Sequence, residues 1–348
     1  TLFRSDFLWG MKTFFDPTIK AGNYSAGALG NAEALGDIVK VLTVMGKLQA
    51  GVASGAWPDT SSPAGKALEK AGIPSRSAIL LLGLMAGLPT QSAHFDSVSG
   101  PEGALKLSFP LAVSPALAVL ENGANAAILA ILATQDVELQ AGGTVFDNSS
   151  TDYAARVADS SVIFNAALSG NTAITAMLGV LAASPRAKAT ASAKVASLAA
   201  TTGKINVPTI MMTGVADPIT PAGATQRIID TYMTQFEAEK EAAKKASYNG
   251  GSYIPAKSKL LAIWSVTPKS WTKFDAAGSP ITTTPAAPGT NHCNFTTANY
   301  LTVANFLVGA GKTGEIKWDG AARKAVRASK GLLVDPDFRA PLLKFYGE

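Results

Sequence analysis

The sequence predicts an α/β protein in which a long helical segment precedes a small parallel sheet. From residue 6 to about residue 200 apolar residues recur at helical spacing, with no sustained alternation of apolar and polar residues. Two short apolar runs follow, Val207–Gly214 and Lys259–Val266, and each ends at a loop. A helical pattern begins at about residue 222, between the two runs. We therefore expect the runs to form two neighbouring parallel strands.

The composition is that of a globular protein with a large core. The chain has 348 residues, of which 47% are apolar and 16% charged, enough for two compact units or for one domain with a large insertion. Its net charge of +5 is modest, and Lys and Arg are scattered until about Lys312. Without a basic stripe interleaved with aromatic residues, nucleic-acid binding is not expected. One cysteine and two histidines exclude an internal disulfide and argue against a cysteine- or histidine-rich metal site.

The first five residues have no clear structural logic. The chain begins Thr1-Leu-Phe-Arg-Ser5 without a methionine, and we interpret residues 1–5 as a non-native scar, with the authentic sequence beginning no earlier than Asp6. A processed N-terminus after signal cleavage is the alternative. Neither interpretation shows a targeting signal, so the location stays open between cytoplasmic and secreted.

Residues 6–203 are expected to form a helical cap or insertion. Helices are predicted near residues 7–15 and 35–48, and Ser62 or Thr60 could cap a third. The run Ser75–Leu88 is apolar almost all round but is too short to span a bilayer, so it is predicted as a buried helix. A helical pair follows from about residue 110 to 139, with an interruption expected at Asn122-Gly123.

Two polar residues follow the predicted strands on loops. Asp217 comes after the glycine that ends the first run, and His292 comes after the second strand, before a threonine suited to cap a helix. Open α/β sheets keep their functional residues at the carboxyl ends of their strands. The acid and the imidazole are therefore expected at one edge of the sheet.

These motifs resemble the C-terminal part of the α/β-hydrolase superfamily. The resemblance rests on Val-Pro-Thr-Ile-Met-Met-Thr-Gly-Val-Ala-Asp-Pro, residues 207–218, and on His-Cys-Asn-Phe-Thr, residues 292–296. It is closest to bacterial hydrolases with a large helical insertion. Residues 62–66 and 147–153 are similar to short motifs that recur in that insertion. The fold it implies is the C-terminal part only: the helical cap, then the last two parallel strands and their flanking helices in residues 204–311. Residues 312–348 are expected to form a tail that adds only surface packing. Where relatives often have a glycine before the histidine, this chain has Asn291.

The resemblance implies a triad in the chain order Ser, Asp, His, with Asp217 and His292 as its second and third members. His292 would act as general base and then acid, and Asp217 would orient the imidazole. The implied reaction is hydrolysis of a small-molecule ester or amide through an acyl-enzyme, without a cofactor. The Ala- and Leu-rich cap favours a substrate with an apolar group. A peptidase, or a dehalogenase with an aspartate nucleophile, would have the same two residues.

No serine of this sequence lies in the motif expected for the nucleophile of the implied triad. No Gly-x-Ser-x-Gly elbow occurs, and the nearest match, Asn23-Tyr-Ser25-Ala-Gly27, follows a helix and a proline instead of a strand. We expect the first strands, the elbow and the oxyanion donors upstream of Thr1. Cys293 and His94 are interpreted as structural.

Two other functions stay open. The chain could be a non-catalytic helical protein that binds an apolar ligand or partner through residues 27–135, or a hydrolase that lost its nucleophile in evolution. In a binding protein nothing requires Asp217 and His292 to meet. The oligomeric state is open.

Overall fold

The computed structural model describes most of the chain and divides it into two compact units. The described residues are 4–88, 90, 115–157, 171–181, 183–198, 203–215, 217, 220, 222–248, 257–266, 271–274, 280–286, 295–329, 331–335 and 337–340. Unit 1 comprises Thr1–Ala199, Ser270–Thr290 and Lys344–Glu348, and unit 2 comprises Ala200–Lys269 and Asn291–Leu343. Each unit has its own buried core.

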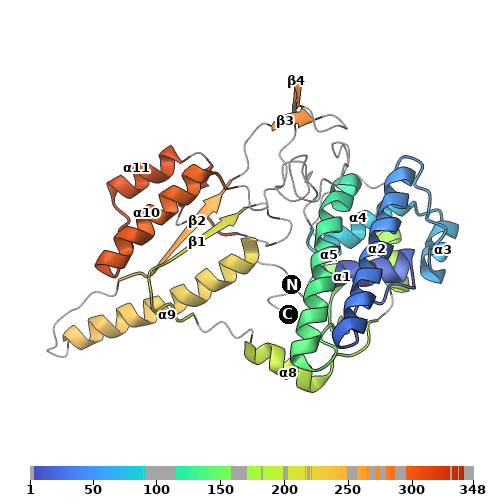
Figure 1. Ribbon diagram of the computed structural model, residues 1–348, viewed down its shortest axis with the longest axis horizontal. Coiled ribbons are helices and arrows are strands. Elements are labelled where there is room, and N and C mark those ends of the chain that lie inside the picture. The colour runs from blue at the N-terminus through green and yellow to red at the C-terminus, as the bar shows by residue number, and fades with distance from the viewer. Residues whose placement is uncertain are drawn as a thin grey trace. The chain divides into compact units, whose positions relative to one another are not determined.

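Unit 1 is built from helices, shown in blue to green in Figure 1, and its described residues up to 198 include no strand. Its elements are α1 (Arg4–Gly10), the π-helix η1 (Met11–Phe15), α2 (Gly27–Gly51), α3 (Pro63–Lys70), α4 (Ser75–Met85), α5 (Pro115–Ala141), α6 (Tyr153–Val157), α7 (Asn171–Val180) and α8 (Ala189–Leu198). Ser62 caps α3, since its hydroxyl accepts the N–H of Gly65 at 3.1 Å. Arg4 begins α1 and Ser5 is buried within it, while the interpretation of residues 1–5 as a scar stays a prediction.

The central helix of unit 1 is α5, which contacts α1, α2, α4 and α8. It runs unbroken for 27 residues, so the expected interruption at Asn122-Gly123 is wrong. The reason is packing: a Cβ on Gly123 would lie 2.5 Å from Cζ of Phe7, so glycine lets α1 approach closely. The short, apolar α4 is buried as predicted.

By length and composition, α5 is the one helix among the described residues that could cross a membrane. The stretch is Ala116–Ala141, and 72% of its most apolar window is buried inside the protein. The core helix of a soluble protein has the same properties, so this is weak support for a membrane span.

An antiparallel pair, β3 (Trp271–Phe274) and β4 (Pro280–Ala286), also belongs to unit 1. The sequence predicts a proline-rich loop from Pro280 to Thr290, which is wrong for residues 280–286. Prolines are tolerated here because β4 pairs on one side only within the described part of the chain.

Unit 2 is a three-layer structure around a small mixed sheet. Its elements are β1 (Thr209–Gly214), α9 (Ala222–Tyr248), β2 (Leu260–Ser265), α10 (Thr297–Thr313), α11 (Gly320–Ala328) and β5 (Leu332–Leu333). The strand order is β1-β2-β5, with β1 and β2 parallel and β5 antiparallel to β2. Figure 1 shows α9 on one side of the β1–β2 pair and α10 and α11 on the other.

Side chains of β2 alternate between the two faces of this sheet, as in any strand, and both faces are covered by helices. Trp264 packs with Ile229 of α9, whereas Ile263 packs with Val326 of α11. This pairing of faces explains why the run is apolar throughout instead of alternating.

Described residues between 320 and 340 contribute to the core of unit 2, so the expectation of surface packing alone is wrong for them. Leu332 pairs with Ser265 in the sheet, and Val326 is 3% exposed. Further along, the ring of Phe338 meets that of Trp264 edge-on at 5.0 Å between centroids. The predicted boundary at residues 311/312 therefore falls inside one packed unit.

Candidate functional site

The carboxyl ends of β1 and β2 lie at the same end of the sheet, because the two strands are parallel. Their pairing extends to the last residues of both strands, where Gly214 is opposite Ser265. The N–H of Val215 then donates to the carbonyl oxygen of Ser265 at 2.9 Å and prolongs the pairing beyond β1. Asp217 follows on the loop, at the end of the sheet where open α/β folds place their chemistry.

The Asp217 carboxylate is buried, at 5% exposed, and the turn after it fixes its orientation. Its Oδ1 accepts the backbone N–H of Thr220 at 2.7 Å, and its Oδ2 accepts the hydroxyl of the same residue at 2.7 Å. A carboxylate can accept about four hydrogen bonds. The turn therefore sets the plane of the group and is compatible with a further donor such as an imidazole N–H.

The predicted base, His292, lies outside the described residues, as do Cys293 and His94. The approach of His292 to Asp217 therefore stays a prediction.

The helix that follows His292 in the sequence begins with a complete capping box. The hydroxyl of Thr296 accepts the N–H of Asn299 at 3.2 Å, and Oδ1 of Asn299 accepts the N–H of Thr296 at 2.9 Å. The buried amide of Asn299 also donates to Oγ of Ser329 at 2.8 Å, which ties the start of α10 to the end of α11. The predicted threonine N-cap is confirmed, and it holds the chain at the start of α10 in a defined position.

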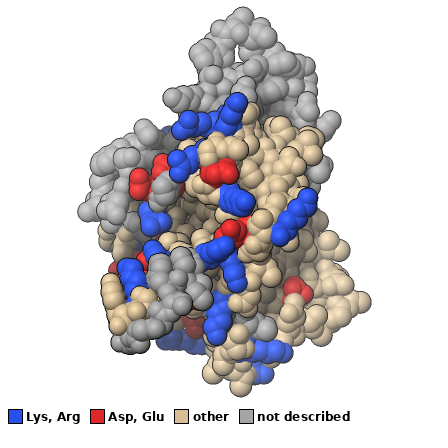
Figure 2. Space-filling view, turned by 90° about the vertical axis from the view of Figure 1, so that its left-hand side faces the viewer, with Lys and Arg blue, Asp and Glu red and all other residues tan. Residues whose placement is uncertain are grey.

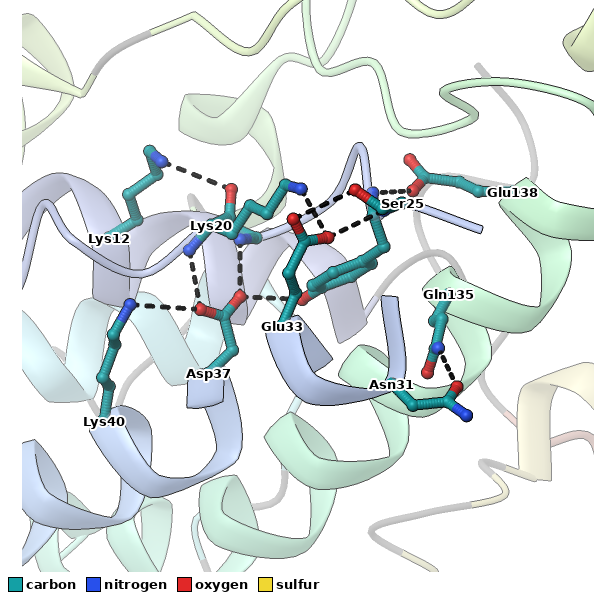
Figure 3. Close-up of polar contacts among 11 residues, drawn as sticks. Lys12, Lys20, Ser25, Asn31, Glu33, Asp37, Lys40, Gln135 and Glu138 are labelled. Carbon is teal, nitrogen blue, oxygen red and sulfur yellow. Dashed lines mark hydrogen bonds and ion pairs between the residues drawn. The ribbon is translucent and has the colours of Figure 1, made fainter. Parts of the chain in front are cut away.

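Ser25, the nearest match to a nucleophile in the sequence, lies in a polar network in unit 1 (Figure 3). Its N–H donates to Glu33 at 2.7 Å and its hydroxyl donates to the same carboxylate at 3.1 Å. The Lys20 ammonium, at 2.6 Å from Glu33, and the N–H of Ser25 together hold the pKa of that carboxyl below its ordinary value. A carboxylate with a lowered pKa is a weak base, so this partner does not activate the hydroxyl for attack.

The backbone around Ser25 also differs from a nucleophile elbow, because no strand precedes it among the described residues. Ala21, Gly22 and Asn23 all have positive φ, at 59°, 128° and 53°. Consecutive residues with positive φ are strained and persist only where contacts from the surrounding structure hold them. Here α2 supplies it: the Asp37 carboxylate accepts the N–H groups of residues 20 and 21 at 2.8 and 2.9 Å.

Further groups complete this network, and Figure 3 shows them converging on the loop from α2 and α5. The Tyr24 hydroxyl donates to Asp37 at 2.8 Å, and the Tyr24 N–H donates to Glu138 of α5 at 3.1 Å. Burial and then the Asp37 charge raise the pKa of the Tyr24 hydroxyl well above its ordinary value. These acids were not recognised from the sequence. The available signal was Asp37, a carboxylate on the buried face of α2 together with Ala34 and Val41. The network fixes a loop and contains no nucleophile with a base.

Within the part of the chain that the structure describes, no group of three or more His, Cys, Asp or Glu side chains could hold a metal ion. Comparison of the sequence with protein-family models gives no match, and comparisons with curated proteins and with solved structures give none either.

Proposed function

We propose that this chain carries the acid and the base of a serine-type hydrolase of the α/β-hydrolase kind. The observation that carries the proposal is the placement of Asp217: a buried carboxylate, oriented by its own turn, at the carboxyl end of a parallel strand pair. The chain order of Asp217, the second parallel strand and His292 is the order that such a triad requires.

In the proposed reaction His292 takes the proton of a serine hydroxyl as that oxygen attacks the carbonyl carbon of an ester or amide. The imidazole then returns the proton to the leaving alcohol or amine, and a water molecule repeats the sequence to release the acid. Asp217 holds the imidazole in the required tautomer and stabilises its cation. The serine and the oxyanion donors are proposed to precede Thr1 in the full-length protein, and the substrate is a small molecule with an apolar group.

A titration of the chain's histidines tests the Asp–His pair without any need for the nucleophile. The chain has two histidines, so a His94→Gln variant assigns the imidazole resonances of both in an NMR spectrum. A carboxylate close to an imidazole favours its charged form. We expect Asp217→Asn to lower the pH midpoint of the His292 titration by about one unit.

The matched control is Asp337→Asn, which removes an exposed carboxylate of unit 2. It should leave the His292 midpoint unchanged, and circular dichroism should show that both variants are folded. Equal midpoints for His292 in the parent and in folded Asp217→Asn would refute the pair and with it the hydrolase proposal.

Activity is the second test. The chain itself should neither hydrolyse p-nitrophenyl esters nor react with a fluorophosphonate, since a base and its orienter lack the oxyanion stabilisation that usually contributes most to the acceleration of acyl transfer. Restoring the preceding gene segment should restore both activities, unless the protein is a degenerate hydrolase. Fluorophosphonate labelling of Ser25, lost in a His292→Ala variant, would make Ser25 the nucleophile instead.

A further inference from the structure

A pocket in unit 2 is bordered by a gap in the sheet. β5 pairs only with Trp264 and Ser265, so the first four residues of β2 have no strand neighbour on that side within the described residues. The pocket has a volume of about 430 Å³, within the range of small-molecule sites. It is lined by Leu260–Ala262 of β2 together with parts of α9, α11 and the segments that flank α11 and β5.

The walls of this pocket are largely apolar. Ile229 and Met233 of α9, Trp264 of β2 and the rings of Trp318 and Phe338 line it. The polar groups in the same wall are engaged within the protein. Gln226 bridges the N–H of residue 340 and the Asp230 carboxylate, and Ser258 bonds the carbonyl oxygen of residue 260. The interior therefore offers a ligand mainly apolar contact.

The rim differs from the walls, because it carries two positively charged side chains. Arg323 and Arg339 both line the pocket and are exposed, and neither guanidinium group forms an ion pair or hydrogen bond with the described residues. Asp335, also in the lining, accepts the N–H of Asp337 at 2.9 Å and makes no salt bridge with either arginine. Figure 2 looks onto the side of the molecule with α9, α10 and α11 and shows Lys and Arg side chains around a hollow.

We propose that this pocket binds an aliphatic carboxylate, with the chain of the ligand against the apolar walls and its carboxylate at Arg323 and Arg339. Guanidinium groups match carboxylates in shape and charge and bind them in two-point contacts. The site is distinct from the proposed catalytic edge, because the described lining of the pocket includes neither Asp217 nor any residue of β1, the strand that Asp217 follows. The proposal therefore holds whether or not the chain belongs to a hydrolase.

Calorimetry on the full chain with octanoate, octanol and octylammonium tests the two parts of this site. Octanoate should bind, and octanol and octylammonium should bind at least about tenfold more weakly, because they lack the charge that the arginines recognise. Each methylene added from octanoate to decanoate should tighten binding about fourfold, from about 0.8 kcal/mol per buried CH₂. Raising the ionic strength should weaken binding of octanoate.

The variant Arg323→Gln/Arg339→Gln should weaken octanoate binding roughly tenfold, as expected for the loss of charge-assisted bonds at an exposed rim. Its control, Lys324→Gln/Arg327→Gln, removes the same charge from exposed positions on α11 that do not line the pocket. The control should match the parent within about twofold, since its charges lie outside the site.

Methionine-methyl NMR locates the ligand independently of affinity. Octanoate should shift the Met233 resonance and leave those of Met45 and Met177, which are buried in the core of unit 1, in place. Equal binding of octanol and octanoate, equal affinity of the two double variants, or an unmoved Met233 resonance would each overturn the proposal. A second copy of the chain in the pocket would overturn it too, and would appear as a concentration-dependent mass without any response to octanoate.

Discussion

A buried ion pair in unit 1 gives the sharpest stability prediction. Nη1 of Arg156 lies 3.0 Å from Oδ2 of Asp6, and both side chains are only 6% exposed. The Tyr153 hydroxyl donates to the other carboxylate oxygen, and Arg156 also donates to the carbonyl oxygen of Met85 at 3.3 Å. These contacts join α1 to α4 and α6, so the loss of the carboxylate leaves a buried guanidinium without its counter-ion.

Breaking a buried pair at one partner costs about 3 to 5 kcal/mol. We therefore expect Asp6→Ala to lower the free energy of unfolding by about 3 kcal/mol, which is a midpoint shift of about 1.5 M urea at a slope of about 2 kcal/mol per M. The double variant Asp6→Leu/Arg156→Met removes both charges and should recover most of the loss. Urea unfolding followed by far-UV circular dichroism measures both.

The control is the exposed pair Glu237–Lys240 on α9, whose side chains are 52% and 38% exposed. Glu237→Ala should cost no more than about 0.5 kcal/mol. If Asp6→Ala costs as little as this control, or if the double variant is less stable than Asp6→Ala, the reasoning from burial is refuted.

Three other outcomes are expected. Ser62→Ala should lower the urea midpoint by an amount equivalent to about 1 kcal/mol, because it removes the side-chain cap of α3; an unchanged midpoint would show that the cap is dispensable. Burial raises the pKa of Tyr24 and Tyr153, so their contribution to stability is complete below about pH 10 and is lost as the pH rises above it. The urea midpoint of the parent should therefore fall between about pH 9 and about pH 11, and the midpoint of the Tyr24→Phe/Tyr153→Phe variant should fall less. A flat profile in the parent would contradict this. The exposed apolar face of α10 should cause self-association in sedimentation experiments, and Leu301→Lys/Val308→Lys should reduce it; a parent that stays monomeric at all concentrations would contradict the idea.

The sequence predicts well those features that depend on local chemistry. Ser62 caps α3 and Thr296 caps α10 because a short polar side chain before a helix satisfies free N–H groups a few residues away. The parallel runs were recognisable because strands buried on both faces are apolar throughout. In each case the signal and its cause lie within a few residues.

Features set by distant partners were mispredicted. Glycine usually destabilises a helix, but Gly123 leaves space for the ring of Phe7 in α1, more than a hundred residues earlier in the chain. β5 has two residues, and only its pairing with Trp264 and Ser265 of β2 makes it a strand. A pattern of one short apolar run cannot distinguish such a strand from a surface loop, so the described residues between 320 and 340 were wrongly assigned to surface packing.

In the candidate site too, residues with a local sequence pattern were predicted and residues with distant partners were missed. Asp217 was found because an acid after an apolar run and a glycine is a local pattern, and the structure adds the orienting turn at Thr220. The acids around Ser25 were missed because their partners are backbone N–H groups of a loop with positive φ, and Glu138 reaches that loop from α5. Only the folded chain brings these carboxylates to one loop.

The surface of unit 2 bears on the proposed hydrolase as well. The face of α10 directed away from the sheet carries Tyr300, Leu301, Leu307 and Val308, each between 41% and 60% exposed. A helix that is apolar all round is typical of a position covered on every side. β1 likewise has one neighbour among the described strands, and its first four residues are only half-buried although parallel strands are normally covered. A sheet that continues beyond β1, with a helix packed against α10, would cover both surfaces at once, as the proposal of further strands in a hydrolase core expects.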